Sequence, residues 1–128
     1  MTIIDVSDLN VYKRSLNGLN LIYRLIRQIP NTHIKLIKQM SSSAESVPAL
    51  ISEGFAKRQS EKELKRFLKI ALGSSDETIT HARVVYLLSN HLRHIDKNLC
   101  EEVGKEYKII SKQLNAMISK WIQYDQIK

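Results

Sequence analysis

The chain has 128 residues, 43% of them hydrophobic, with only four glycines and two prolines. This length and composition predict a single folded domain over residues 1–128 and exclude a disordered or low-complexity protein. Lysine and arginine outnumber aspartate and glutamate by 20 to 13, and the resulting formal charge of +7 favours a polyanionic partner over a cationic one.

The first predicted element is a helix over about residues 7–29, capped by Ser7. One apolar seam follows steps of three and four: Leu9, Tyr12, Leu16, Leu19, Tyr23 and Ile26. Further apolar residues make roughly two thirds of the circumference of this helix hydrophobic. The core of a single bundle cannot cover that much apolar surface. We therefore expect a subunit interface on this helix, at Val11, Leu21, Leu25 and Ile29. The remaining polar strip carries Lys13, Arg24 and Arg27.

The second predicted helix spans about residues 31–57. Its seam is Ile37, Met40, Ala44, Val47, Ile51 and Phe55, with small residues around it that permit close approach of another helix. Pro48 lacks a backbone donor, so we expect a kink near it. Glu53 stands beside Gly54 on the small-residue side, and we expect it in a buried hydrogen bond between helices or subunits, as part of the oligomer interface.

The third predicted helix, about residues 60–89, opens with a capping box of Ser60 and Glu63. Its seam is Leu64, Leu68, Ala71, Ser75, Thr78, Ala82 and Val85, and its first turns carry Lys62, Lys65, Arg66 and Lys69. A fourth helix starts near Asp96, with a heptad seam of Val103, Tyr107, Ile110, Leu114, Met117, Trp121 and Tyr124. Its charges nearly balance, so we expect it to contribute little to ligand binding.

Four helices joined by short connections predict an all-α fold, an antiparallel up-down-up-down four-helix bundle with a kinked second helix. No window of the sequence alternates polar and apolar residues well enough to indicate a strand.

A family resemblance supports this fold. The segment Ala-Glu-Ser-Val-Pro-Ala-Leu-Ile-Ser-Glu-Gly-Phe at 44–55, with Phe-Leu-Lys-Ile-Ala-Leu-Gly-Ser at 67–74, resembles a four-helix-bundle family. That family includes proteins encoded in intervening sequences of bacterial large-subunit ribosomal RNA genes, and the accessory variability determinant proteins of diversity-generating retroelements belong to the same superfamily. The resemblance implies a barrel-like homopentamer without known catalysis. In the retroelement branch it also implies binding of nucleic acid and of a reverse transcriptase.

The uneven charge gives the candidate ligand site. Residues 1–70 hold 12 basic and 6 acidic side chains. We predict that RNA or DNA binds, with little sequence specificity, to a basic set made of Lys13, Arg24, Arg27, Arg58, Lys62, Lys65, Arg66 and Lys69. An ordinary solvated surface is the alternative. Most aromatic residues fall on seams, where core packing is expected rather than stacking on bases.

Other candidate sites have simpler interpretations. His91 and His94 are spaced to share a metal ion, but no Cys or acidic pair nearby completes a ligand set, so we expect no metal. Glu77 and His81 could act as an acid–base pair with Ser74 or Ser75, yet a helix surface offers no oxyanion hole, so we expect no catalytic residues and no cofactor. Cys100 beside Leu99 is expected to pack as a small apolar residue.

The cellular setting follows from absences in the sequence. A single cysteine rules out an intrachain disulfide, no apolar stretch approaches the ~18 residues of a membrane span, and the N-terminus does not read as a signal peptide. We therefore expect a cytoplasmic protein away from the membrane. Two functions remain open: an oligomeric nucleic-acid-binding accessory protein, which could partner a reverse transcriptase, and an assembly or adaptor protein whose ligand is another protein.

Overall fold

Four long α-helices make up the fold. The computed structural model describes the backbone of residues 5–127 and the side chains of residues 5–120. The helices are α1 (Asn10–Ile26), α2 (Ile34–Ala56), α3 (Glu61–Leu88) and α4 (Lys97–Ile127), and the 3₁₀ turns η1 (Val6–Asp8) and η2 (Asn31–His33) precede the first two. No strand occurs in the described part of the chain.

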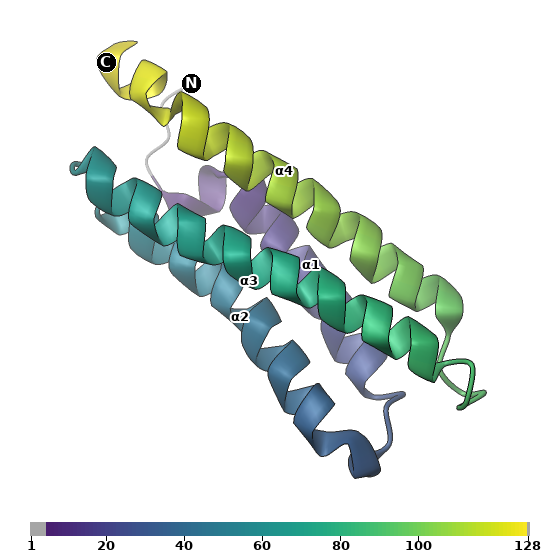
Figure 1. Ribbon diagram of the computed structural model, residues 1–128. Helices are drawn as coiled ribbons and strands as arrows, with labels where there is room; N and C mark the ends of the chain where they lie inside the picture. Colours follow the sequence, from purple (N-terminus) through teal and green to yellow (C-terminus); the bar gives the residue numbers. More distant parts are fainter. Residues whose placement is uncertain (1–4, 128) are drawn as a thin grey trace.

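The helices form an up-and-down bundle. Each packs against its two neighbours, α1 with α2 and α4, and α3 with α2 and α4, while α1 lies diagonally across from α3 (Figure 1). This arrangement confirms the predicted all-α four-helix bundle. α2 is helical throughout, with the buried Pro48 inside it, and it bends about midway along its length in Figure 1.

The helix starts differ in part from the prediction. Asp5, rather than Ser7, caps the first turn: its carboxylate accepts hydrogen bonds from Ser7, and a capping box with Asp8 orders η1. α1 itself begins only at Asn10. The cap of α3 is confirmed in part, because the Ser60 hydroxyl accepts a hydrogen bond from the Glu63 amide at 3.2 Å. The reciprocal half of the predicted capping box does not form: the Glu63 carboxylate pairs with Arg66, and the Ser60 amide donates to the Lys57 carbonyl.

The predicted seams of α2, α3 and α4 form the core. All seven seam residues of α3 are buried, and the α2 seam is buried from Met40 to Phe55. On α4 the seam is buried at Val103, Tyr107, Ile110 and Leu114, whereas Trp121 and Tyr124 lie outside the described side chains. Close packing of α2 on α3 needs Gly54, since a Cβ there would lie 3.0 Å from Phe67 Cβ.

The predicted face of α1 was wrong. The side that turns inward carries Val11, Ser15, Gly18, Ile22 and Leu25. Leu16 and Tyr23, which belong to the predicted seam, are 42% and 36% exposed. The two faces are about 100° apart on the helix, and the inward one was overlooked because two of its positions are the small residues Ser15 and Gly18.

This rotation overturns most of the predicted oligomer interface. Val11, Leu25 and Ile29 are buried in the core of the protomer, where they have no free surface for another subunit, and Leu21 is half-buried against the same core. Glu53 is exposed and lies 3.6 Å from Lys57 one turn along α2, instead of making a buried bond to another helix.

Candidate nucleic-acid interface

The predicted basic residues fall into two separate groups. Lys13, Arg24 and Arg27 are exposed on α1, and Arg27 lies about 21 Å along the axis from Lys13. The other five residues surround the turn between α2 and α3. Because neighbouring helices are antiparallel, Arg24 and Arg27 lie at the opposite end of the bundle from this turn. The eight residues therefore do not form one continuous strip.

The group at the turn, here the turn cluster, consists of Arg58, Lys62, Lys65, Arg66 and Lys69. Two of its members are already paired within α3: Lys65 Nζ lies 2.8 Å from Glu61 Oε1, and Arg66 Nε lies 2.8 Å from Glu63 Oε2. The bond to Arg66 lowers the pKa of the Glu63 carboxyl. Lys62 and Lys69 are exposed without a carboxylate partner among the described residues.

Aromatic rings hold several cations at this turn. The Arg58 guanidinium lies 4.0 Å from the centre of the Phe55 ring and donates a hydrogen bond to the Phe55 carbonyl at 3.0 Å. Arg66 and Lys57 lie 4.4 and 4.7 Å from the centre of the Phe67 ring. These contacts favour particular orientations of long side chains that would otherwise be free, so the turn offers cations at partly fixed positions.

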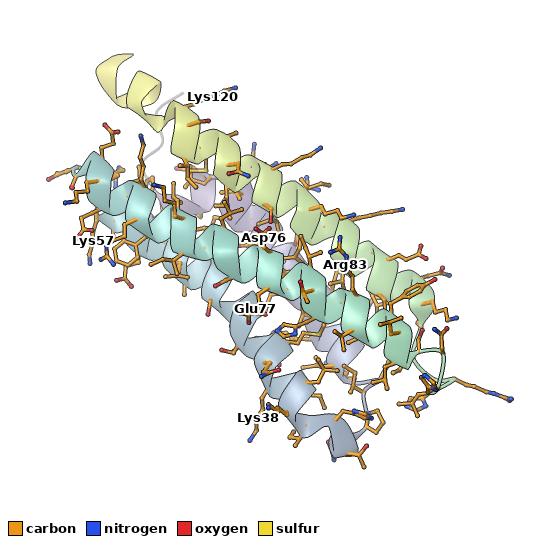
Figure 2. The ribbon with its side chains drawn as sticks, viewed as in Figure 1. Lys38, Lys57, Asp76, Glu77, Arg83 and Lys120 are labelled. Atoms are coloured by element: carbon orange, nitrogen blue, oxygen red, sulfur yellow. The ribbon has the colours of Figure 1, made fainter. Side chains whose placement is uncertain are left out.

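A third basic group, which the sequence analysis missed, lies between α3 and α4. Arg83, Lys105 and Lys108 line a groove of about 290 Å³, here the α3–α4 groove, together with Ile79, Ala82, Tyr86, Cys100, Glu101 and Gly104. Figure 2 shows Arg83 projecting from α3 on the side of α4. In the described structure no carboxylate lies within ion-pair distance of these three cations.

Buried polar contacts fix the register that assembles this groove. The Ser75 hydroxyl lies within hydrogen-bond distance of two acceptors on α4, Ser111 Oγ at 2.8 Å and the Tyr107 carbonyl at 3.1 Å. The Ser111 hydroxyl donates to Asp76 at 2.8 Å. A slip of one helix along the other would break these bonds, so the register keeps Arg83 beside the segment of α4 that carries Glu101, Lys105 and Lys108. The sequence of α4 alone does not indicate this group, because the charges of α4 nearly balance. The group forms only when Lys105 and Lys108 of α4 lie beside Arg83 of α3.

The α3–α4 groove and part of the turn cluster lie on one side of α3. Lys65 and Arg83 are 18 residues apart, which is about five helical turns, so the two side chains leave α3 in the same direction about 27 Å apart. Lys69 lies between them and is offset by about 40°. Asp76 is the one acidic side chain of α3 on this line between them, and it is already bonded to Ser111.

An exposed apolar stripe lies elsewhere, on α1 beside α2. It consists of Leu16 and Tyr23, flanked by the half-buried Tyr12, Leu19 and Ile26. Tyr23 donates a hydrogen bond to Glu45 of α2 at 2.6 Å. Next to this contact the outer face of α2 is hollowed over about 420 Å³, where the small residues Ser41, Ser42, Ser46 and Ala49 line it with Ile37, Lys38 and Glu45.

The remaining candidates do not assemble into reactive sites. His81 lies 3.3 Å from Glu77, but Ser75 is buried and bonded toward α4. The Ser74 backbone carbonyl accepts a hydrogen bond from the Thr78 hydroxyl, and Ser74 lies two helical turns from His81. His91 and His94 are exposed, and no third His, Cys or carboxylate joins them within the described residues. Burial raises the pKa of the Cys100 thiol to about 11, with a smaller contribution from Asp96, so it is not an activated nucleophile.

Comparison with known families confirms one part of the sequence resemblance, the family of intervening-sequence proteins. A model of the family described as 23S rRNA-intervening sequence protein matches residues 7–116, a stretch that contains the turn cluster and the α3–α4 groove. No curated protein matches the chain. None of the described helices is both long and apolar enough to cross a membrane.

Proposed function

The chain belongs to the 23S rRNA-intervening sequence protein family, and from this membership we propose that it is a non-enzymatic, self-associating protein that binds nucleic acid through its basic surface. The ligand is RNA or DNA, bound mainly through phosphates and with little sequence specificity. The family name connects these proteins with ribosomal RNA genes, which supports a nucleic-acid ligand over other polyanions.

The observation that carries this proposal is the excess of cations without partners. Among the residues that the structure describes, only Arg14, Lys57, Lys65 and Arg66 lie within ion-pair distance of an Asp or Glu carboxylate. The other described lysines and arginines face solvent or stack on rings. Each lysine or arginine that contacts a phosphate releases counterions condensed on the nucleic acid. This release favours binding at low salt and does not depend on the base sequence.

The absence of an assembled catalytic group supports the non-enzymatic part. A nucleophile, a base and an oxyanion-binding pair of donors have to converge in a water-excluding cleft. Ser74 lies two helical turns, about 10.5 Å along α3, from His81, and Ser75 is buried and bonded toward α4. The α3–α4 groove holds three cations, one carboxylate and one tyrosine, with no histidine or serine among its lining residues.

Self-association is supported by the apolar stripe of α1. Leu16 and Tyr23 are exposed next to the hollow of α2, and a second copy of the chain would cover both. A pentamer, and a reverse transcriptase as partner, come from the family resemblance alone. The same stripe favours a second candidate function, an adaptor that binds another protein and no nucleic acid.

An electrophoretic mobility shift at two salt concentrations tests the proposal. The wild-type chain should shift single-stranded RNA and DNA at 50 mM salt and much less at 200 mM salt. A variant with Gln at Arg24, Arg27, Lys65, Arg66 and Lys69 should bind more weakly, while its circular dichroism and sedimentation stay unchanged. The adaptor function would replace this proposal if neither nucleic acid shifts at the lower salt concentration.

A further inference from the structure

The cations of the α3–α4 groove surround an accessible aromatic ring. Tyr86 lines the groove beside Arg83, and it is 37% exposed, unlike the buried rings of Phe55 and Phe67. Lys97 Nζ lies 5.7 Å from the centre of the Tyr86 ring, which adds a further positive charge at this end of the groove. A positively charged groove with an accessible aromatic side chain is the usual arrangement in proteins that bind single strands.

We propose that the α3–α4 groove binds a segment of single-stranded nucleic acid, with phosphates on Arg83, Lys105 and Lys108 and one base against Tyr86. This inference rests on the proposed nucleic-acid-binding function and names the site and the form of the ligand. It also reverses the expectation that α4 contributes little.

The size of the groove favours a single strand over a duplex. A volume of about 290 Å³ lies near the lower end of pockets that hold small molecules, so it fits one nucleotide unit. Only an unstacked base can reach an aromatic ring, and bases in a duplex are already stacked on one another.

The charge balance in the groove favours an anion. Three cations and one carboxylate, that of Glu101, line it. The cations have no carboxylate within ion-pair distance in the described structure, so no internal bond has to break when a phosphate binds. The floor of Ile79, Ala82, Cys100 and Gly104 is apolar, and a base that covers it would remove apolar surface from water.

Basic residues follow the same side of α3 out of the groove, with the Asp76 carboxylate between them. Lys69 and Lys65 lie about 21 and 27 Å along α3 from Arg83. A strand with the stacked rise of about 3.4 Å per nucleotide would cover 27 Å with about eight nucleotides, and an unstacked strand, which is more extended, covers it with fewer. We therefore expect affinity to rise with oligonucleotide length up to at most about eight nucleotides and to change little beyond that.

Fluorescence anisotropy with a labelled 12-nucleotide single-stranded RNA, the same DNA sequence and its duplex tests this site. The groove variant replaces Arg83, Lys105 and Lys108 with Gln. The control variant replaces Lys35, Lys38 and Lys120, which are exposed, unpaired in the described structure and away from the groove (Figure 2). The groove variant should bind single strands at least tenfold more weakly at low salt. Its log–log salt slope should fall by about 2, since each phosphate contact accounts for about 0.7. The control variant should stay within threefold of the wild type.

The aromatic contact has its own readout. Tyr86→Ala should weaken single-strand binding about fivefold or more while leaving the salt slope unchanged, and Tyr86→Phe should bind like the wild type. Loss of affinity for the duplex should be smaller in both the groove variant and Tyr86→Ala. Circular dichroism of every variant checks that the bundle is intact, and crosslinking of 4-thiouridine RNA to the wild-type protein, which requires no substitution, should label the peptide that contains Tyr86.

The outcomes separate the site from the function. If the groove and control variants lose affinity equally, or if crosslinks map only to α1, the wild type still binds and the groove is not the site. If the wild type binds neither RNA nor DNA at 50 mM salt, the proposed function fails and the groove site fails with it.

Discussion

The ring of Tyr107 on α4 lies directly over Gly18 of α1. A Cβ placed on Gly18 would lie 3.0 Å from both Cε2 and Cζ of Tyr107, closer than almost any real contact of this kind. The ring is fully buried, so it has little space to move away. This contact explains why α1 turns its small residues inward, and it thereby determines which α1 side chains remain on the surface.

Gly18→Ala should therefore destabilise the bundle by about 1–2 kcal/mol, because overpacking against Tyr107 outweighs the helix propensity gained by removing glycine. Gly73→Ala is the matched control: Gly73 is also inside a helix and has no atom within 4 Å of its Cβ position. The control should be about 0.5–1 kcal/mol more stable than the wild type. Urea unfolding of both variants measures this, and a Gly18→Ala protein as stable as the control would contradict the close contact.

Tyr107→Phe should leave stability unchanged or raise it by up to about 1 kcal/mol. The Tyr107 hydroxyl is buried without a hydrogen-bond partner in the described structure. It loses its hydrogen bonds to water on folding and gains none in the protein, so removing it should not destabilise the folded state. Thermal melting of the variant tests this, with Tyr107→Ala as a comparison that should lose about 3–5 kcal/mol through cavity formation. A marked loss of stability on Tyr107→Phe would show that the hydroxyl is satisfied, for example by a buried water.

Leu16→Glu should prevent self-association while leaving the fold intact, because Leu16 belongs to the exposed apolar stripe and contributes little to the protomer core. Leu87→Glu serves as the control, since Leu87 is the most exposed large apolar side chain among the described residues at 64% and lies on α3, away from the stripe. Sedimentation velocity at micromolar concentration should give a species of about 15 kDa for the first variant only, close to the 14.8 kDa chain mass. Dissociation caused by Leu87→Glu alone would place the interface on α3.

Stability should fall as the pH rises from about 8.5 to 11, in part because of Cys100. Burial raises the pKa of its thiol to about 11 in the folded chain, whereas an unfolded cysteine titrates near 8.5. Between these pH values the folded state binds more protons than the unfolded state. The contribution of the buried thiol to the free energy of unfolding is therefore present in full below pH 8.5 and is lost as the pH rises toward 11. Urea unfolding at pH 8.0 and 10.5 should show a decline about 2 kcal/mol larger for the wild type than for Cys100→Ala. Equal declines would mean that the thiol titrates normally.

The buried face of a helix was predictable where large apolar residues occur on only one side of it. The seven-residue seam of α3 is buried throughout, although it includes Ser75 and Thr78, because large residues on both sides define its direction. α1 offered two apolar faces, and only packing against Tyr107 selects the one with Gly18. A sequence pattern contains no information on which of two apolar faces meets a partner helix.

The site was less predictable than the fold, since it depends on register between helices. Arg83 and Lys105 are far apart in the sequence and come together only because Ser75 and Ser111 fix the alignment of α3 and α4. Counting charges along the chain placed the basic surface in the first half, where Lys65 and Arg66 turn out to be paired with glutamates. One available signal was the spacing of Lys65, Lys69 and Arg83, which puts them on one side of a helix that was correctly predicted.

The salt dependence of nucleic-acid binding by the wild-type chain tests the central claim most directly. Affinity for a 12-nucleotide single-stranded RNA, measured between 50 and 300 mM salt, should fall linearly on a log–log plot with a slope of magnitude about 2 or more, the value for at least three phosphate contacts. Binding that is absent at 50 mM salt for both RNA and DNA, or that does not change with salt, would contradict the account.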